Sequence, residues 1–214
     1  PSQPVPLLFN LHGRTGTAYS TMWHADFRPI ADTANFIIVH PQGLLDNTGV
    51  THWNIGQSSV DDIGFIEALY QKLISDYNID LDKVYSTGMS NGGYMSYYLA
   101  CDMSDKIAAI ASVTGAMSLY TQIICNPVHP TPVMEIHGTY DFTVPFNDII
   151  SGLEYWRDYN NCDLIADTTL IPDIVLGDMS TVEHIVYNNG SNGVTTELFK
   201  VIGGGHTWPG SNFS

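Results

Sequence analysis

Five consecutive residues near the middle of the chain could carry nucleophilic chemistry: Gly88-Met89-Ser90-Asn91-Gly92 follows an apolar run and precedes a segment of helical periodicity. A sharp strand-to-helix turn lifts a serine hydroxyl above a sheet, and small flanking residues allow the tight backbone. The helix start behind it adds positive potential where a negatively charged oxygen would form. We therefore interpret Ser90 as a candidate nucleophile, with an ordinary glycine-rich turn as the alternative.

A serine hydroxyl is a weak nucleophile and needs a base that a carboxylate orients. In enzymes built on this turn, the serine comes first along the chain, then the acid, then the histidine. Of the four histidines after Ser90, we favour His206, which lies in a glycine-rich loop directly after an apolar strand. By contrast, His184 lies inside a strand-like stretch and His129 lies between prolines.

The candidate acid is Asp141, which lies just past another apolar run. Loops at strand ends are where catalytic groups sit, so this carboxylate can point at a histidine on the loop after the next strand. We interpret the nearby His137 as structural. Two backbone N–H groups, those of Asn91 and Arg14, are the candidate donors to an oxyanion. Arg14 follows the pair His12-Gly13 at the end of the first apolar run, where a simple turn is the alternative.

Strands that alternate with helices would position these residues. We expect strands at 5–11, 36–39, 83–87, 107–113, 133–136 and 195–202, helices at 59–77, 91–102 and 148–159, and a hairpin signal at 188–190. Such alternation predicts an α/β protein with a mostly parallel central sheet and helices on both faces. No repeat or linker divides the chain, so we expect a single domain over residues 1–214.

Charge and composition exclude several classes of protein. The 214 residues include 7 Lys+Arg and 22 Asp+Glu, for a net charge of −15. A nucleic-acid binder with a basic surface is therefore excluded, and binding to anionic membranes is disfavoured. No apolar run reaches the roughly 18 residues that a membrane span needs. The three cysteines lack the spacing of a zinc site, and Cys101–Cys125 is our candidate disulfide, although spacing alone does not establish it.

Taken in order, these motifs resemble the polyhydroxybutyrate depolymerase-like and feruloyl-esterase branch of the α/β-hydrolases, which overlaps carbohydrate esterase family one. The matching segments are Leu11-His12-Gly13, His40-Pro41-Gln42-Gly43, 60–66, 88–93, 137–141 and 203–210, which cover nearly the whole chain. The resemblance implies an α/β-hydrolase fold and secreted ester hydrolysis, extracellular or periplasmic. It implies Ser90 as nucleophile, Asp141 as acid and His206 as base, with no cofactor and no metal.

The sequence departs from this family pattern in two places. Arg14 stands where the family often has cysteine. A backbone N–H serves whatever the side chain, so we hypothesise separately that the Arg14 side chain leans over the site and favours carboxylate or polar sugar groups. Family members usually carry strands before the first strand seen here and a helix after the histidine loop, so we expect Pro1 and Ser214 to be the ends of a trimmed product.

Aromatic rings near the motifs are candidates for binding substrate. Trp208, Tyr94 and Trp53 could stack on an aromatic or sugar group, with core packing as the alternative. We assign Asp61 and Asp62 to the capping of a helix rather than to acid–base chemistry. The expected substrate is a feruloyl or acetyl ester on polysaccharide. Short polyhydroxyalkanoate or generic acyl esters, and a non-catalytic carbohydrate-binding protein, are the alternatives.

Overall fold

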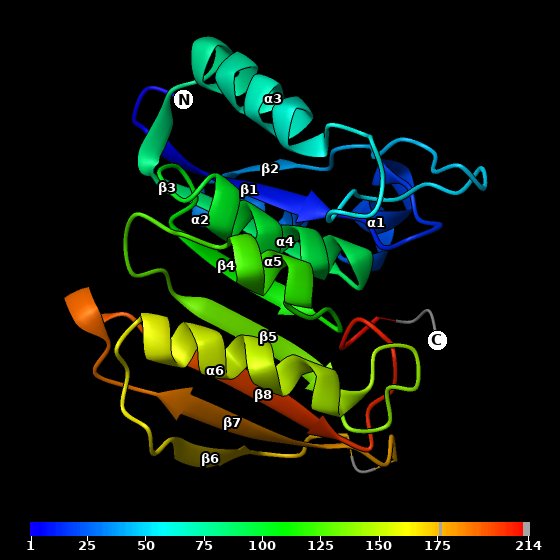
Figure 1. Cartoon of the computed structure of the whole chain (residues 1–214), viewed down its shortest axis with the longest axis vertical. Helices are drawn as coiled ribbons and strands as arrows, with labels where there is room; N and C mark the ends of the chain where they lie inside the picture. The colour runs from blue at the N-terminus through cyan, green and yellow to red at the C-terminus, as the bar shows by residue number, and fades with distance from the viewer. Residues whose placement is uncertain (176, 212–214) are drawn as a thin grey trace.

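Apolar runs from along the chain become neighbouring strands of one eight-stranded sheet in the computed structural model, which describes residues 1–175 and 177–211 (Figure 1). Its order is β2-β1-β3-β4-β5-β8-β7-β6, and all neighbours from β2 to β8 pair in parallel, whereas β7 and β6 are antiparallel additions. The strands are β1 (Val5–Leu11), β2 (Ile37–Val39), β3 (Ile79–Met89), β4 (Ala109–Val113), β5 (Val133–Gly138), β6 (Asp167–Ile171), β7 (Thr181–Tyr187) and β8 (Thr196–Ile202). This confirms the predicted mostly parallel sheet.

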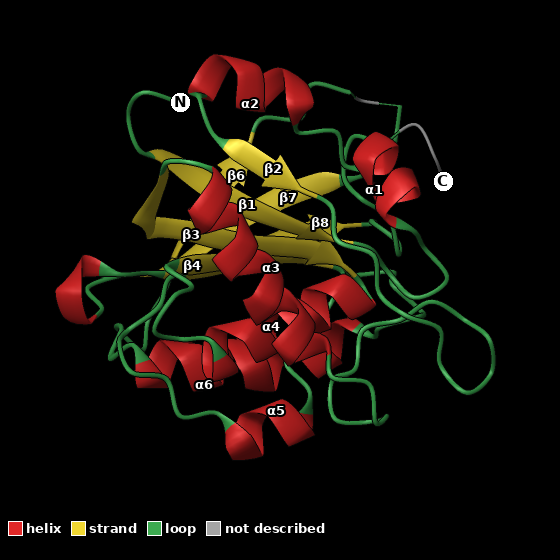
Figure 2. Cartoon of the chain, turned by 90° about the horizontal axis from the view of Figure 1, so that it is seen from above, coloured by secondary structure: helices red, strands yellow, loops and turns green. Residues whose placement is uncertain are grey.

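Helices pack on both faces of the sheet, as predicted (Figure 2). Helices α3, α4, α5 and α6 cover one face, whereas α1 and α2 lie on the other, beside β1 and β2 (Figure 1). The helices are α1 (Ala18–His24), α2 (Arg28–Ala34), α3 (Asp62–Asp76), α4 (Asn91–Asp102), α5 (Leu119–Ile124) and α6 (Ile150–Tyr159), with short 3-10 turns η1 (Phe146–Ile149) and η2 (Ser191–Gly193). Within the described residues, no helix is both long and apolar enough to cross a membrane.

The main hydrophobic core lies between the sheet and the larger helical layer. Phe9 and Leu11 from β1, Ile66 from α3 and Leu99 from α4 have no exposed surface and belong to one packed cluster. Burying one such side chain contributes about 1.5–3 kcal/mol, so this layer holds the strand ends in a fixed arrangement. On the opposite face, half-buried side chains of the central strands, such as Met134, line cavities of about 280 and 390 Å³.

Local hydrogen bonds set where the predicted elements begin. Helix α3 starts at Asp62 rather than at residue 59, because the Asp61 carboxylate caps it by accepting from the Gly64 N–H at 2.8 Å. The buried Asp62 carboxylate accepts from the Asn54 N–H at 2.6 Å, so both acids are structural, as predicted. The hairpin signal at 188–190 begins a longer connection between β7 and β8 that contains η2.

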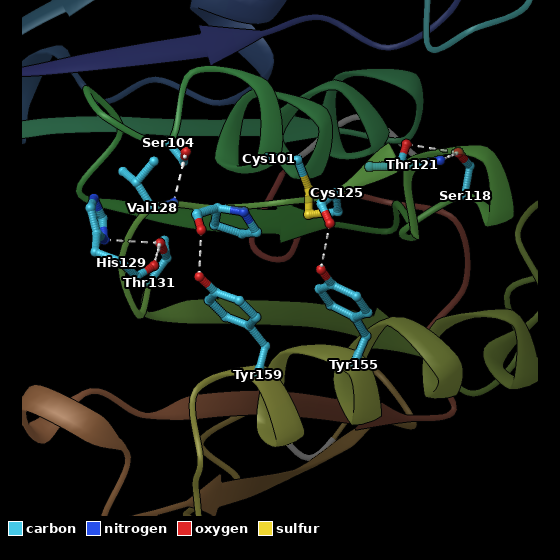
Figure 3. Close-up of a disulfide and its surroundings, with 11 residues drawn as sticks. Cys101, Ser104, Ser118, Thr121, Cys125, Val128, His129, Thr131, Tyr155 and Tyr159 are labelled. Atoms are coloured by element: carbon cyan, nitrogen blue, oxygen red, sulfur yellow. Dashed lines mark hydrogen bonds between the residues drawn. A yellow bond between two sulfur atoms is a disulfide. The ribbon is translucent and has the colours of Figure 1, made fainter. Parts of the chain in front are cut away.

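A disulfide ties α4 to the end of α5 on one face of the sheet, and it confirms the predicted Cys101–Cys125 pair (Figure 3). Cys101 lies in the last turn of α4, and Cys125 directly follows α5. The Tyr155 hydroxyl of α6 donates to the Cys125 carbonyl at 3.2 Å, so three helices meet at this bridge. Cys162 is buried and unpaired. Ser214, the end of the expected domain, lies outside the described residues.

Candidate active site

The carboxyl ends of the parallel strands bring the predicted motifs to one edge of the sheet. Strand β1 ends just before His12, β3 just before Ser90, and β8 four residues before His206. Strand β5 ends three residues before Asp141. Open α/β sheets bind ligands outside these carboxyl ends, so this edge is the candidate active site.

The turn at Ser90 has the strained backbone expected of an exposed nucleophile. Ser90 has φ 54° and ψ −119°, a conformation that residues with a side chain rarely adopt. Its N–H donates to the Val113 carbonyl at 2.8 Å, and its carbonyl accepts from the Tyr94 N–H at 3.0 Å. Such a backbone costs about 1–3 kcal/mol and persists only where its surroundings hold it.

Gly88 and Gly92 allow the first strand to approach this turn closely. A Cβ on Gly88 would lie 2.7 Å from the Leu11 carbonyl oxygen, and a Cβ on Gly92 would overlap the same oxygen. A larger residue at either position would push β1 away from the turn. The two glycines therefore fix the distance between Ser90 and the loop that begins at His12.

Asp141 and His206 form a direct hydrogen bond. The His206 Nδ1–H donates to Asp141 Oδ2 at 2.6 Å, which leaves Nε2 of the neutral ring free to take a proton. The other oxygen of Asp141 accepts from the Thr143 and Val144 N–H groups at 2.9 and 2.8 Å. Because Asp141 is 3% exposed, these contacts hold the carboxylate in one orientation.

The two predicted oxyanion donors, the N–H groups of Asn91 and Arg14, belong to segments that adjoin Ser90. Asn91 is the first residue of α4, and an N–H in the first turn of a helix has no acceptor within that helix. From the other side, the loop after β1 approaches the serine, because a Cβ added to Gly13 would lie 3.5 Å from Ser90 Cβ. The N–H of Arg14 follows directly in this loop.

The Arg14 side chain does not have the freedom that we hypothesised. Its guanidinium donates to the Asp46 carboxylate at 2.6 Å and to the Thr48 hydroxyl at 3.2 Å. Hydrogen bonds from Thr48 and Arg14 hold the pKa of Asp46 well below its usual range. The guanidinium is therefore tethered to Asp46 and Thr48, on the loop after β2.

Trp53 is a structural residue, and its predicted contact with substrate is wrong. The side chain is 1% exposed, and its Nε1–H donates to the His12 carbonyl at 2.9 Å. Its backbone N–H donates to Asn91 Oδ1 at 2.6 Å, and its carbonyl accepts from Asn91 Nδ2 at 3.1 Å. Trp53 therefore joins the loop after β1 to the start of α4, which are the two segments that carry the candidate oxyanion donors.

His12 supports the same loop from inside the protein. The ring is fully buried, its Nε2 accepts from the Gly43 N–H at 2.9 Å, and its centroid lies 4.9 Å from the Trp53 ring. Burial lowers the pKa of His12, so the ring stays neutral near neutral pH and can accept this bond. The His-Gly pair thus has a structural role beside the turn that contains Ser90.

The other two predicted aromatic residues lie nearer the surface. Trp208 is half-buried, packs edge-on against Phe27 at 5.9 Å, and lines a cavity of about 120 Å³ together with Gly13 and Met89. Tyr94 is half-buried one turn after Ser90, and burial raises the pKa of its hydroxyl. Trp208 is the better placed of the two to touch a substrate.

Sequence reasoning missed an exposed aromatic pair beside the acid. Tyr140 and Phe142 flank Asp141 in the sequence, and their side chains are 65% and 91% exposed. Their two rings stack on each other, with centroids 6.4 Å apart. Alternation of aromatic residues around a buried acid is the signal that could have found them. Among the described residues, no group of three or more His, Cys, Asp or Glu side chains is arranged to hold a metal.

A sequence profile of the phospholipase/carboxylesterase family matches residues 53–189, which is more than half of the chain and includes Ser90 and Asp141. The chain belongs to the phospholipase/carboxylesterase family. Membership in this family confirms the predicted relationship to esterases of the α/β-hydrolase fold and the expectation of a serine ester hydrolase.

Known proteins similar to this family member are esterases. The chain is 29% identical to the bifunctional acetylxylan esterase/xylanase of Neocallimastix patriciarum, over 76% of this chain and 23% of that protein. It is 27% identical to feruloyl esterase B of Piromyces equi, over 94% of this chain and 39% of that protein. It therefore spans less than half the length of these two relatives. An acetyl xylan esterase from Aspergillus awamori shares the fold, with a TM-score of 0.78 at 17% identity and coverage of 98% and 86% of the two chains.

Proposed function

We propose that this protein removes short acyl groups, acetyl above all, from a polysaccharide, through a triad of Ser90, His206 and Asp141. The observation that carries the proposal is the 2.6 Å hydrogen bond between His206 and Asp141, at the same sheet edge as the strained turn of Ser90. A base held by a buried carboxylate, together with a half-buried serine on a strained turn, is the arrangement that activates a hydroxyl for acyl transfer.

In the proposed mechanism, His206 Nε2 takes the proton of the Ser90 hydroxyl as its oxygen attacks the ester carbonyl. Asp141 holds the ring in the required tautomer and stabilises the imidazolium that forms. The N–H groups of Asn91 and Arg14 bind the negatively charged oxygen, at about 3 kcal/mol for each donor. Protonated His206 then donates its proton to the leaving alcohol. Water, activated by the same ring, releases the acid from the acyl-enzyme.

The preference for a short acyl group rests on the cavity lined by Met89, the residue that precedes Ser90. The volume of about 120 Å³ between Gly13, Met89 and Trp208 is smaller than the roughly 150 Å³ cavity that holds a benzene ring. A space of this size favours an acetyl group over the larger aromatic ring of a feruloyl group. The feruloyl esters that the sequence suggested equally are therefore the less favoured substrate.

Polysaccharide as the carrier is supported by the exposed rings of Tyr140 and Phe142, since aromatic faces can pack against the apolar faces of sugars. The name of one relative, a bifunctional acetylxylan esterase/xylanase, points the same way. Secretion to the cell exterior or periplasm is supported by the Cys101–Cys125 disulfide, because such bonds persist in oxidising compartments. No nucleic acid or membrane is part of the proposed function.

The test compares wild-type protein with Ser90→Ala on acetylated xylan, p-nitrophenyl acetate and methyl ferulate. We expect the wild type to cleave both acetyl esters and to act poorly on methyl ferulate. Ser90→Ala should keep its fold and lose turnover by about 10⁶-fold, because the nucleophile is removed. Ser59→Ala, the same change at an exposed serine, is the matched control and should retain full activity.

Two outcomes would contradict this function. Ester hydrolysis that survives in folded Ser90→Ala would remove Ser90 from the mechanism. Wild-type protein that neither hydrolyses esters nor reacts with a fluorophosphonate probe would favour the non-catalytic carbohydrate-binding alternative.

A second candidate substrate is a short polyhydroxyalkanoate. It is favoured by exposed apolar side chains on α5, where Leu119 and Ile123 are 72% and 75% exposed. Cleavage of a hydroxybutyrate oligomer with a higher kcat/KM than acetylated xylan would select this candidate.

A further inference from the structure

Two more titratable side chains lie fully buried behind Asp141, and the proposed mechanism does not use them. Glu135 and His137 are both on β5, two residues apart, so they point to the same face of the sheet. Neither has any exposed surface. The His137 Nδ1 lies 3.1 Å from Glu135 Oε1, and Nε2 lies 2.8 Å from the Val144 carbonyl oxygen and 3.5 Å from Asp141 Oδ2.

Hydrogen-bond chemistry limits where the protons of this pair can be. The Val144 carbonyl can only accept, so His137 Nε2 carries a proton. The Nδ1 atom faces a carboxyl oxygen, so a second proton lies between Nδ1 and Glu135 Oε1. The Tyr97 hydroxyl donates to the other oxygen of Glu135 at 3.1 Å. Either an ionised Glu135 facing a doubly protonated ring or a protonated Glu135 donating to Nδ1 satisfies these contacts, and the first places a positive charge 3.5 Å from Asp141 Oδ2.

The pKa values of Glu135 and His137 are both raised, which agrees with a proton retained by this pair. Burial raises the pKa of Glu135 to about 7, although neighbouring His137 opposes the rise. Burial lowers the pKa of His137, but hydrogen bonding and charge from Glu135 outweigh it, so the net pKa is raised. The other titratable groups around the pair are Tyr97 and Tyr94 of α4, Asp148 of η1 beside Tyr94, and His206 beyond Asp141. Burial raises the pKa of both tyrosines, which stay neutral.

We propose that Glu135 and His137 are positioning residues that hold a protonated ring behind Asp141, so that this carboxylate is an oriented anion between two imidazoles. The proposal rests on the triad proposed above. The His137 ring lies on one side of Asp141 Oδ2 at 3.5 Å, and His206 binds the same oxygen at 2.6 Å. A positive charge on His137 attracts the Asp141 carboxylate and repels a positive charge on His206, which binds the same carboxylate oxygen. The base is then free to work at lower pH.

Glu135→Gln tests the proposal because it removes the charge and preserves the shape. The new amide N–H can donate to Nδ1 of a neutral His137, while the amide oxygen still accepts from Tyr97. We expect kcat/KM for p-nitrophenyl acetate to fall about tenfold, the lower end of the roughly 10–100-fold loss seen when the partner that orients a metal-binding histidine is removed. The acid limb of the pH profile, which reports loss of the proton from the base, should move up by about half a pH unit because a nearby positive charge is gone.

The matched control is Glu197→Gln, on β8. Glu197 contacts His184 at 2.7 Å, so this change breaks a similar carboxylate–imidazole pair away from Asp141. Its pH profile should match that of the wild type. A folded Glu135→Gln protein with an unmoved acid limb would overturn the proposal. The triad itself would stand, because Ser90→Ala tests it separately.

A measurement on wild-type protein keeps the proposal testable even if Glu135→Gln does not fold. Nitrogen-15 NMR of the imidazole rings, with the His137 signals assigned by their loss in His137→Gln, reports whether each nitrogen carries a proton. We expect both His137 nitrogens to be protonated across the pH range of activity. An unprotonated Nδ1 in that range would overturn the proposal.

Discussion

Trp53 and Trp208 are the same residue type near the same serine, yet the structure gives them different roles. Trp53 is 1% exposed, and its ring Nε1–H donates a hydrogen bond to the His12 carbonyl. Trp208 is half-buried and lines the cavity beside Met89. Residue type alone predicts that both could stack on a substrate. Only burial and hydrogen bonding separate a residue that shapes the site from one that can touch the ligand.

For single residues, we predict that Trp53→Phe lowers the stability of the protein and leaves substrate binding intact. The change keeps an aromatic ring but leaves the His12 carbonyl without its donor, which costs about 1–3 kcal/mol. Thermal unfolding should show a Tm lower by a few degrees, roughly 2–4 °C per kcal/mol for a chain of this size. The KM for p-nitrophenyl acetate should not change.

Trp208→Phe is the comparison variant, and it should change KM while leaving Tm nearly unchanged. If Trp53→Phe instead raised KM at an unchanged Tm, Trp53 would be a substrate contact after all.

The bounds of a secondary-structure element were predictable where its apolar pattern lies between clear turn residues. Strand β1 and helix α4 have the bounds predicted from the sequence, because each is a clear apolar pattern between turn residues. The short helices α1, α2 and α5 have six or seven residues, too few for a periodicity to be visible. The predicted start of α3 at residue 59 is three residues too early. The hydrogen bond from the Asn54 N–H to Asp62 and the cap by Asp61 hold residues 59–61 outside the helix.

The disulfide is a contact between elements, and we predict that it stabilises the layer of α4, α5 and α6. Cys101 and Cys125 are 24 residues apart, and closing a loop of about this length stabilises by roughly 3 kcal/mol. Replacing both cysteines by alanine should therefore lower Tm by roughly 6–12 °C. Differential scanning calorimetry measures the difference.

Reducing agent provides the control for this prediction. It should lower the Tm of the wild type toward that of the double variant and leave the variant unchanged, since Cys162 is unpaired. Equal Tm values for the oxidised wild type and the variant would show that the bridge adds no stability.

The charge of the whole molecule is strongly one-sided. All seven Lys and Arg side chains form ion pairs with carboxylates, and the 22 Asp+Glu leave a large unpaired excess. Exposed ion pairs contribute little, typically about 0–1 kcal/mol, whereas the excess negative charge repels itself throughout the folded state. Repulsion should therefore outweigh the ion pairs in the response of this protein to salt.

We predict that Tm rises when NaCl is raised from about 0.01 M to about 0.15 M, since the screening length falls from about 30 Å to about 8 Å. Calorimetry at constant pH measures this rise. The charge-reversal variant Asp82→Lys, at an exposed position, has a smaller negative charge. Its Tm should therefore rise less with salt than that of the wild type. A Tm that falls with salt would mean that the ion pairs dominate.

By itself, the amino-acid sequence determined the fold class and the serine turn, and it predicted Asp141 and His206 as the candidate acid and base. Each of these depends on a local pattern: apolar runs, a glycine-flanked serine, and polar residues just after strands. Tertiary structure decided everything that depends on which groups meet. It buried Trp53, tethered Arg14 to Asp46, exposed Tyr140 and Phe142, and placed His137 against Glu135 and Asp141. Burial and hydrogen-bond partners are properties of residues distant in the chain, and no local pattern encodes them.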